Sequence, residues 1–302
     1  MKLQEFNVQL LDTTSTIACF GKRHSGKTVL ICDLMYNLHK YGGKKGIKPD
    51  LIIVFSATDE MQSNFSKFVP SGFIHQEFSE SKLISILELQ KSLKLKQGRC
   101  PCVVVIIDDM GFDRNVLNTP TIARIFSNGR HYNIMFIMSF QYVHQLPASL
   151  RANLDVTIAL KEPIISNRKR LFQSLYGIMG SFKVFEKSFR EVTNDYGAMI
   201  SVSNGSSSNL IEKNIFWYKA SLDVPDTFKA GRPVFWEWSK QYKLNQQHRS
   251  ITNRNNSIVQ VKKEDIRSRH SHHSQRAQQH NDTNSQRSHH AVNNAPPLSL
   301  IL

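Results

Sequence analysis

The chain has 302 residues and is basic, with 39 Lys and Arg against 24 Asp and Glu and a formal net charge of +15. Its 40% hydrophobic residues suffice for one large α/β domain or two small ones. No run of about 18 apolar residues predicts a membrane span, and Met1–Glu5 lacks the apolar stretch of a secretory signal. The charge favours a polyanionic partner, most simply nucleic acid. The four cysteines lack zinc-site spacing and favour a reducing compartment.

The first decisive stretch is a phosphate-binding loop. Residues 1–16 have alternating apolar positions and predict an edge strand. Ile17–Phe20 predicts a buried strand, and apolar residues at helical spacing from Leu30 to Leu38 predict a helix. The segment between them fits G-x-x-x-x-G-K-[ST] in the strand–loop–helix context that this motif needs. Its residues, all expected to contact nucleotide, are Gly21, Lys22, Arg23, His24, Ser25, Gly26, Lys27 and Thr28.

The motif assigns a role to each part of the loop. Gly21 and Gly26 let the backbone bend so that its N–H groups point at phosphate oxygens, and the start of the helix adds a favourable dipole. Lys27 is predicted to contact the β- and γ-phosphates, and the hydroxyl of Thr28 is predicted to bind Mg²⁺.

A second decisive stretch follows a less regular insert. Leu51–Phe55 predicts another buried strand, and residues 81–94 within the insert have helical spacing. Five aliphatic residues, Val103–Ile107, then lead directly into Asp108 and Asp109. Ligands of open α/β sheets bind at the carboxyl ends of strands. We therefore expect Asp108 to support Mg²⁺ and Asp109 to orient and activate the attacking water.

The remaining elements predict an α/β fold. A helix is expected around residues 121–128, then a strand at 134–138 that ends in Ser139-Phe140-Gln141, and a strand at 155–160. Helices at 166–176 and 182–189 precede late strands at 198–202 and 214–218, the latter two joined by a Ser/Asn-rich turn at 204–209. Repeated alternation of strand and helix predicts a mostly parallel sheet with helices on both faces.

The composition changes near residue 246, which divides the chain into a predicted ATPase domain at 1–245 and a tail at 246–302. Gln, Asn, Ser, His and Arg dominate the tail, which is too polar to fold and is expected to be a disordered basic segment. Seven of the twelve His lie there, but their irregular spacing makes metal binding the weaker interpretation. The tail carries a net charge of +5, so +10 remains on the predicted domain.

The nucleotide is predicted to be ATP, because the Asn-Lys-x-Asp element typical of guanine specificity is absent. A small-molecule kinase is the rival class. It would need an arginine-rich lid, and the basic balance of the chain argues against it.

Several short motifs in the same order carry a family resemblance. Besides the phosphate loop they are Val54-Phe55-Ser56, Ile107-Asp108-Asp109, residues 128–134 (Asn-Gly-Arg-His-Tyr-Asn-Ile), Ser139-Phe140-Gln141 and residues 166–171 (Ser-Asn-Arg-Lys-Arg-Leu). Together they resemble the genome-packaging ATPases of large eukaryotic DNA viruses, the poxvirus type, within the FtsK/HerA group of DNA-pumping ATPases. The resemblance covers about residues 17–236.

The resemblance implies a RecA-like core of the ASCE type, in which the Ser-Phe-Gln strand lies between the phosphate-loop strand and the Asp-Asp strand. It implies a hexameric or pentameric ring with ATP at subunit interfaces and duplex DNA through the middle. Asp109 takes the position where cellular relatives have Glu, and Gln141 resembles the sensor of the γ-phosphate. Arg130 is the candidate arginine finger. A surface or DNA-facing role for Arg130 stays open, and Arg124, Arg168 and Arg170 are rivals for the finger role.

These features predict an ATP-driven duplex-DNA translocase that packages a viral genome into a preformed capsid, with capsid or vertex proteins as partners and an assembly site inside the host cell. DNA contacts are expected to be mostly to phosphates, from the loops around Lys44, Lys45 and Lys48 and from the tail. Two alternatives remain open: a cellular HerA-like translocase in repair or conjugation, and a weakly hydrolysing, regulatory ATP-binding module for assembly.

Overall fold

The fold is built on one nine-stranded sheet with the order β1-β9-β8-β7-β2-β6-β5-β3-β4. The computed structural model describes residues 2–57, 59–110, 114–203, 209–221 and 224–245. Among the described strands only β8 runs against its neighbours, so the predicted mostly parallel sheet is confirmed. The strands are β1 (Gln4–Glu5), β2 (Thr16–Phe20), β3 (Leu51–Ser56), β4 (Ile74–His75), β5 (Val103–Asp108), β6 (Ile134–Phe140), β7 (Val156–Leu160), β8 (Gly197–Val202) and β9 (Ile215–Lys219).

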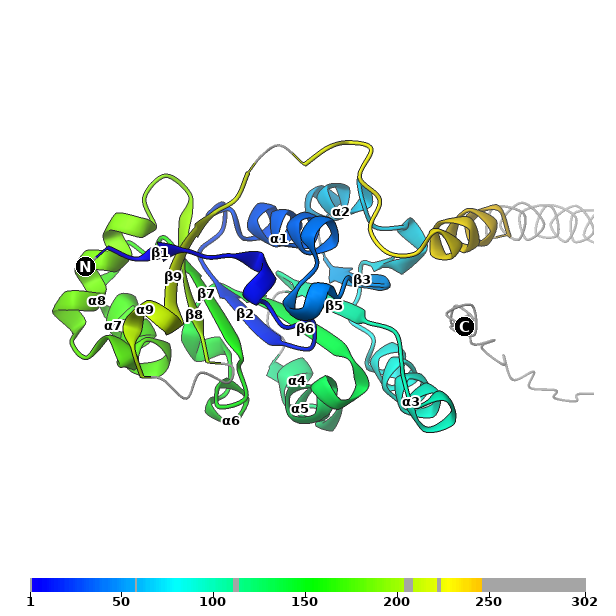
Figure 1. Cartoon of the computed structure of the whole chain (residues 1–302), viewed down its shortest axis with the longest axis horizontal. Helices are drawn as coiled ribbons and strands as arrows, with labels where there is room; N and C mark the ends of the chain where they lie inside the picture. The colour runs from blue at the N-terminus through cyan, green and yellow to red at the C-terminus, as the bar shows by residue number, and fades with distance from the viewer. Residues whose placement is uncertain (1, 58, 111–113, 204–208, 222–223, 246–302) are drawn as a thin grey trace, which may run out of the picture.

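Helices cover both faces of the sheet. Figure 1 shows α1 and α2 on one side, α3, α4, α5 and α6 on the other, and α7, α8 and α9 gathered at the end that carries β8 and β9. The helices are α1 (Lys27–Tyr41), α2 (Asp59–Ser66), α3 (Glu80–Gln97), α4 (Arg114–Leu117), α5 (Pro120–Asn128), α6 (Ala148–Arg151), α7 (Ile165–Leu175), α8 (Phe182–Val192) and α9 (Ile211–Asn214).

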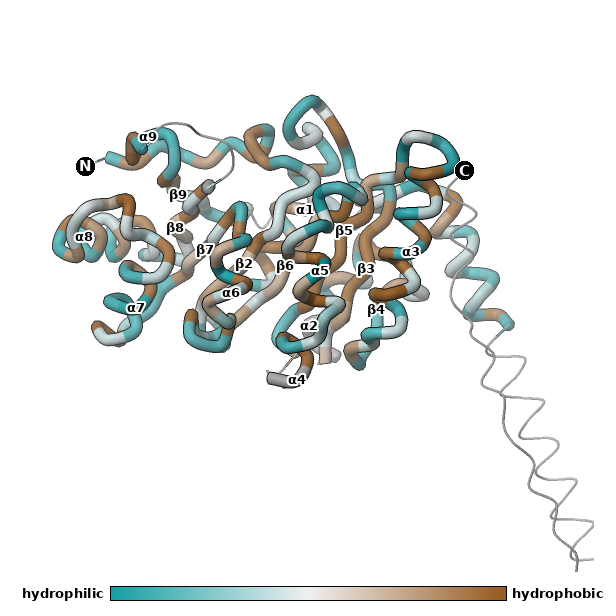
Figure 2. Tube along the Cα trace, turned by 90° about the horizontal axis from the view of Figure 1, so that it is seen from below, coloured by the Kyte–Doolittle hydropathy of each residue, from teal (hydrophilic) through white to brown (hydrophobic). Residues whose placement is uncertain are grey.

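The central strands form the core. Every residue of β2, β3, β5, β6 and β7 is buried, as expected of parallel strands with helices on both faces. Figure 2 shows this as hydrophobic colour along β3 and β5 inside a more hydrophilic shell of helices. This buried frame fixes the carboxyl ends of β2, β5 and β6, where the phosphate loop and the two aspartates emerge.

The amino-terminal segment and the insert differ from the sequence expectation. The edge strand is limited to two residues, and Val8–Leu10 forms a 3-10 turn with Leu10 exposed. In the insert, α2 and the short strand β4 were not predicted. Phe65, Phe68 and Phe73 of this insert are fully buried, so these three aromatic residues serve packing.

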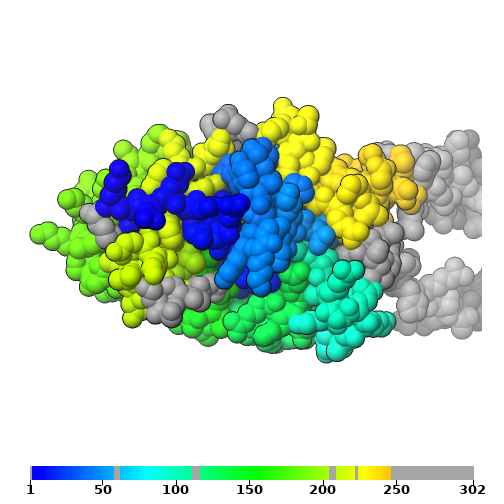
Figure 3. All heavy atoms as spheres, viewed as in Figure 1, coloured from blue at the N-terminus to red at the C-terminus, as the bar shows by residue number. Residues whose placement is uncertain are grey.

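Residues 224–245 also belong to the packed structure. Phe228 lies against Tyr36 of α1 at a ring-centroid distance of 5.0 Å, and Phe235 lies against Phe73 at 5.5 Å. Residues 233–245 are helical, which the sequence analysis did not predict. The space-filling view in Figure 3 shows this late segment, in yellow, directly beside the blue surface of α1. The predicted tail at 246–302 and most of the predicted turn at 204–209 lie outside the described residues.

Candidate nucleotide-binding site

The phosphate loop connects the end of β2 to the start of α1. The local geometry at each end of the loop requires a glycine, at Gly21 and at Gly26. Gly26 caps α1 with a left-handed backbone, φ 94°, that side chains other than glycine adopt at a cost. A Cβ on Gly21 would lie 2.5 Å from the Ser25 Oγ atom and 3.1 Å from the Leu160 Cβ atom. The Ser25 hydroxyl is itself buried and has no hydrogen-bond partner among the described residues. The loop is therefore tightly closed around a buried hydroxyl whose hydrogen-bonding capacity is not used by the described residues.

Lys27 is held inside the loop. Its side chain is 5% exposed, and its Nζ atom donates hydrogen bonds to the carbonyl oxygens of Gly21 at 2.8 Å and Lys22 at 3.0 Å. An ammonium group has three donors and no acceptor, so it can exchange these carbonyl contacts for phosphate oxygens. The Lys27 ammonium group thus lies at the N-terminus of α1, and a helix N-terminus favours the binding of phosphate.

A hydrogen-bonded cluster joins the loop to the ends of β5 and β6. The Thr28 hydroxyl donates to Asp108 Oδ2 at 2.7 Å, and the Ser139 hydroxyl donates to Asp108 Oδ1 at 2.6 Å. The Asp109 backbone N–H donates to the Ser139 Oγ atom at 2.9 Å. Ser139 therefore connects both aspartates. From the sequence, Ser139 was predicted only as a polar strand end. The signal for its role lies in the pairing of β5 and β6, which sets Ile107 beside Met138 and so Asp108 beside Ser139.

The charge of Asp108 is balanced by its surroundings. Burial raises the pKa of this fully buried carboxyl, and the nearby Asp109 carboxylate also raises it. The hydrogen bonds from Ser139 and Thr28 and the charge of Lys27 oppose that rise. The ionised form that a cation site needs thus depends on these three neighbours.

We expect Ser139→Ala to lower ATP hydrolysis about tenfold or more at neutral pH, because a hydrogen bond to an ionised group contributes about 1.5–3 kcal/mol. Removing one of the contacts that lower the pKa of Asp108 raises that pKa further. The carboxylate is then lost at a higher pH as the pH falls, so the acid limb of the pH–rate profile should move upward. Ser188→Ala, a buried serine on α8, serves as the control. An unchanged profile in Ser139→Ala would contradict this role.

Asp109 and Gln141 face each other at the same sheet edge. Gln141 Nε2 lies 3.4 Å from Asp109 Oδ1, a long hydrogen bond, and Asp109 has a left-handed φ of 45° that turns the chain away from β5. Gln145 fixes the segment after β6, because its side-chain oxygen accepts from the backbone N–H groups of Gln141 at 2.9 Å and Tyr142 at 2.8 Å. Gln141 and Asp109 are both half-buried.

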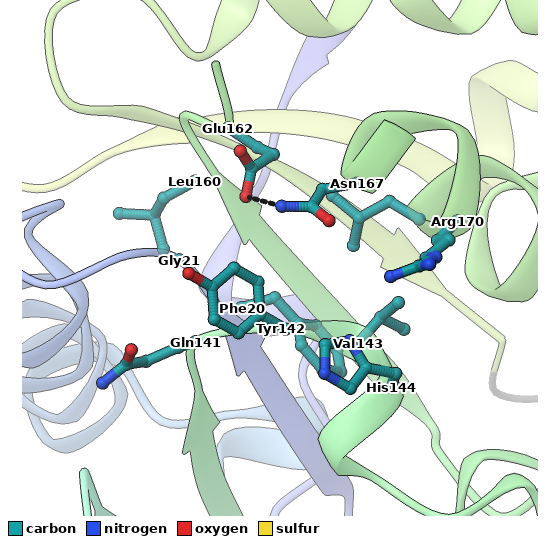
Figure 4. Close-up of a pocket in the computed structure, with 11 residues that line it drawn as sticks. Phe20, Gly21, Gln141, Tyr142, Val143, His144, Leu160, Glu162, Asn167 and Arg170 are labelled. Atoms are coloured by element: carbon teal, nitrogen blue, oxygen red, sulfur yellow. Dashed lines mark hydrogen bonds between the residues drawn. The ribbon is translucent and has the colours of Figure 1, made fainter. Parts of the chain in front are cut away.

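A small pocket borders the loop on the side of β7 and α7. Figure 4 shows Gln141 and Tyr142 beside Gly21, with Glu162 and Arg170 across the pocket. Glu162 is 6% exposed and lies 3.6 Å from the Lys22 Nζ atom, which ties the first half of the loop to the end of β7. Arg23 and His24, at the tip of the loop, are exposed. Sequence reasoning missed Glu162, which has no motif of its own.

The structure separates the four arginines that were considered as fingers. Arg168 is buried and bonds to the Glu162 and Pro163 carbonyls and to Glu186, so its guanidinium is held by contacts within its own chain. Arg170 lines the pocket beside the phosphate loop of the same chain. Arg124 is exposed on α5 and pairs with Glu88. Arg130 is exposed in a 3-10 turn, Gly129–Tyr132, that precedes β6.

Arg130 is a predicted site residue that lies away from the phosphate loop. β6 has seven residues, so its two ends are roughly 20 Å apart at about 3.3 Å per residue. Arg130 lies at the amino end of β6, and Gln141 follows the carboxyl end. It therefore cannot contact a nucleotide in its own phosphate loop.

The donor set fits Mg²⁺, for which the Thr28 hydroxyl and the Asp108 carboxylate offer two oxygens 2.7 Å apart. Mg²⁺ prefers oxygen ligands and usually combines one or two protein oxygens with phosphates and water. The described residues contain no group of three His, Cys, Asp or Glu side chains suited to a metal. The described helices also include none long and apolar enough to cross a membrane.

A phosphate loop after β2, an acidic end on β5 and a polar strand end on the intervening β6 define a P-loop NTPase of the RecA-like type. The predicted position of β6 between β2 and β5 is confirmed. The chain belongs to the poxvirus A32 protein family, whose model matches residues 3–174. This match confirms the resemblance that the sequence motifs indicate.

The chain is also similar to proteins of large DNA viruses. It is 32% identical over 219 residues to the uncharacterized protein 088R of Invertebrate iridescent virus 3, covering 72% of this chain and 80% of that protein. It is 30% identical over 251 residues to an uncharacterized protein of Acanthamoeba polyphaga mimivirus, covering 80% and 84%. The genome packaging NTPase B204 of Sulfolobus turreted icosahedral virus 2, solved with ATP-gammaS, aligns at 19% identity with a TM-score of 0.48 over 70% of this chain and 100% of that one.

Proposed function

We propose that this chain is an ATPase that packages viral DNA, converting ATP hydrolysis into movement of duplex DNA into a preformed capsid. The observation that carries the proposal is the hydrogen-bonded cluster of Thr28, Asp108, Ser139 and Asp109 around the phosphate loop, in a chain of the poxvirus A32 protein family. The proposed location of the reaction is a virus assembly site inside the host cell. The proposed docking partners are vertex or capsid proteins.

Each residue of the cluster has a proposed task. Lys27 exchanges its loop carbonyls for the β- and γ-phosphates, and Thr28 and Asp108 hold Mg²⁺, which would neutralise phosphate charge. Asp109 accepts a hydrogen bond from the attacking water and directs its lone pair at the γ-phosphorus. Gln141, within reach of Asp109, senses whether the γ-phosphate is present. Hydrolysis of this kind depends on positioning and charge more than on covalent chemistry.

The position of Arg130 supports a head-to-tail ring. The phosphate loop lies at the carboxyl edge of the sheet, and Arg130 lies at the opposite edge. If one subunit's carboxyl edge packs on its neighbour's amino edge, every nucleotide meets an Arg130 from the next subunit. Such heterologous contacts generate closed rings when the rotation per subunit closes.

A basic loop offers a candidate DNA contact. Lys44, Lys45 and Lys48 are exposed in the connection from α1 to β3, at the edge of the sheet opposite the phosphate loop. Lysines on a loop suit phosphate contacts, which carry no sequence information. The proposed contact is therefore independent of sequence and sensitive to salt.

We expect duplex DNA to stimulate ATP hydrolysis by the purified full chain, and the stimulation to fade as salt rises. The logarithm of the DNA-binding constant falls linearly with the logarithm of the salt concentration. Replacing Lys44, Lys45 and Lys48 by Ala should make this fall less steep by about 0.9 for each DNA phosphate that is no longer neutralised, up to roughly 3. The matched control replaces the exposed lysines Lys183, Lys187 and Lys213 by Ala, which removes equal charge at α8 and α9. Equal slopes in the two triple variants would reject this loop as the DNA-binding segment. Hydrolysis that DNA does not change would favour the regulatory module.

A further inference from the structure

An exposed tyrosine lies beside the phosphate loop with no task in the packing of the chain. Tyr196 is 67% exposed, among the most exposed large hydrophobic side chains described. A Cβ built on Gly26 would lie 3.4 Å from the Tyr196 Cδ1 atom, so the ring borders the residue that caps α1. Val29, in the first turn of α1, is also exposed at 38%. An aromatic face and an aliphatic side chain thus flank the place where the helix begins.

The backbone under this tyrosine is unusual. The Gly197 N–H donates to the Asn194 carbonyl at 3.0 Å, which closes a turn whose central residues are Asp195, with φ 49°, and Tyr196, with φ 60°. Two successive positive φ angles define a type I′ turn, in which Asn-Gly and Asp-Gly are preferred. A large aromatic residue in the second central position is strained relative to glycine. Strained non-glycine residues are concentrated at functional sites.

The turn is anchored so that the ring stays near the loop. Asp195 forms an ion pair with Lys219 of β9, which ties the turn to the sheet. The turn leads directly into β8, which is antiparallel to β7 and therefore begins at the edge where β7 ends. That edge also carries the phosphate loop, because β7 pairs in parallel with β2. The ring is thus part of the nucleotide edge of the sheet.

The ring of Tyr196 also lies where the base of a bound nucleotide would be expected. Lys27 and the first N–H groups of α1 would take the phosphates, so the base must lie outside the loop. Gln141 and Asp109 are on the β6 and β5 side, which is the side of the γ-phosphate. Tyr196 is on the opposite, β8 side of the loop. Stacking on an aromatic side chain tolerates every base, because every base has a π-face.

We infer that Tyr196 is the stacking platform for the base of the bound nucleotide. The inference rests on the proposed function, since it assigns a second part of the same nucleotide site. The Asp195 Oδ2 atom pairs with Lys219, which holds the turn in place, and the ring of Tyr196 offers a π-face that adenine and guanine match equally. The platform therefore increases affinity for purine nucleotides without selecting adenine over guanine.

The test compares a nucleotide with a ligand that lacks the base. Dissociation constants of ADP, GDP and inorganic tripolyphosphate are measured by titration calorimetry on the full-length wild type, Tyr196→Gly and Tyr196→Phe. Stacking is worth enough that Tyr196→Gly should weaken ADP and GDP by the same factor, about tenfold, and leave tripolyphosphate unchanged. Tyr196→Phe keeps the ring and should bind ADP within about twofold of wild type.

Two controls separate stacking from structural effects. Tyr196→Gly should not lower the melting temperature, because glycine suits this backbone. Asp195→Gly relaxes the same turn but keeps the ring, and should leave ADP binding within about twofold. The inference is overturned if Tyr196→Gly binds ADP like wild type, or if it loses tripolyphosphate as strongly as ADP. Failure of the proposed function looks different: wild type would bind none of the three ligands, or Lys27→Ala would bind all of them normally.

Discussion

Lys27→Ala is expected to reduce ATP hydrolysis by about 10³-fold or more and to weaken binding of ADP and tripolyphosphate together. The reason is that the 5%-exposed ammonium is the buried cation of the loop, and its charge acts in an environment with little water. Steady-state hydrolysis by the purified full chain, with and without duplex DNA, measures the loss. The melting temperature of the variant shows whether the loop still folds.

Lys22→Ala is the matched control for this prediction. Lys22 belongs to the same loop, but its side chain is 32% exposed and its Nζ atom lies 3.6 Å from Glu162. Glu162 keeps hydrogen bonds from the Ile164 N–H at 2.8 Å and from Asn167 Nδ2 at 3.2 Å when the Lys22 side chain is removed, so Lys22→Ala should keep hydrolysis within about fivefold of wild type. If the two variants lose equal activity with unchanged folding, the special role of Lys27 is wrong.

The strand ends that form this site could be predicted because each is marked by a short motif in the sequence. A buried apolar run followed by Gly21–Thr28, and another followed by Asp108 and Asp109, define two strand ends without reference to the rest of the chain. Parallel strands that have helices on both faces appear in the sequence as continuous runs of apolar residues. The strands β3, β6 and β7 were therefore predicted in the same way. The family motifs then placed β6 between β2 and β5, which periodicity alone does not give.

The parts that sequence reasoning missed depend on tertiary contacts. Ser139 matters only because β6 pairs with β5 in one register, so that its hydroxyl reaches Asp108. Tyr196 lies 170 residues after Gly26 in the chain and reaches it only through the antiparallel turn into β8. The helix at residues 233–245 is stabilised by packing of Phe235 and Trp238 on Phe73. Such contacts leave no periodic pattern within a short window.

Arg130→Ala is expected to lower hydrolysis by about 10³- to 10⁵-fold while leaving ADP binding unchanged. An arginine supplied to the γ-phosphate in the transition state has an effect of this size. Because Arg130 and the phosphate loop lie at opposite edges of the sheet, the contact must come from a neighbouring subunit. Arg124→Ala, which removes an exposed arginine that pairs with Glu88, is the control and should stay near wild type.

Mixing two inactive variants tests whether Arg130 acts on the neighbour. A ring with Arg130→Ala and Lys27→Ala subunits contains some interfaces where an intact phosphate loop meets an intact Arg130. Random mixing in equal amounts makes about one quarter of the head-to-tail interfaces complete, so hydrolysis should return to that order. A mixture as inactive as its components, or an Arg130→Ala variant as active as wild type, would reject the finger. Loss of DNA stimulation alone, with basal hydrolysis intact, would instead assign Arg130 to the DNA-facing surface, because a residue that contacts only phosphates of DNA changes binding and its salt dependence and not the chemical step.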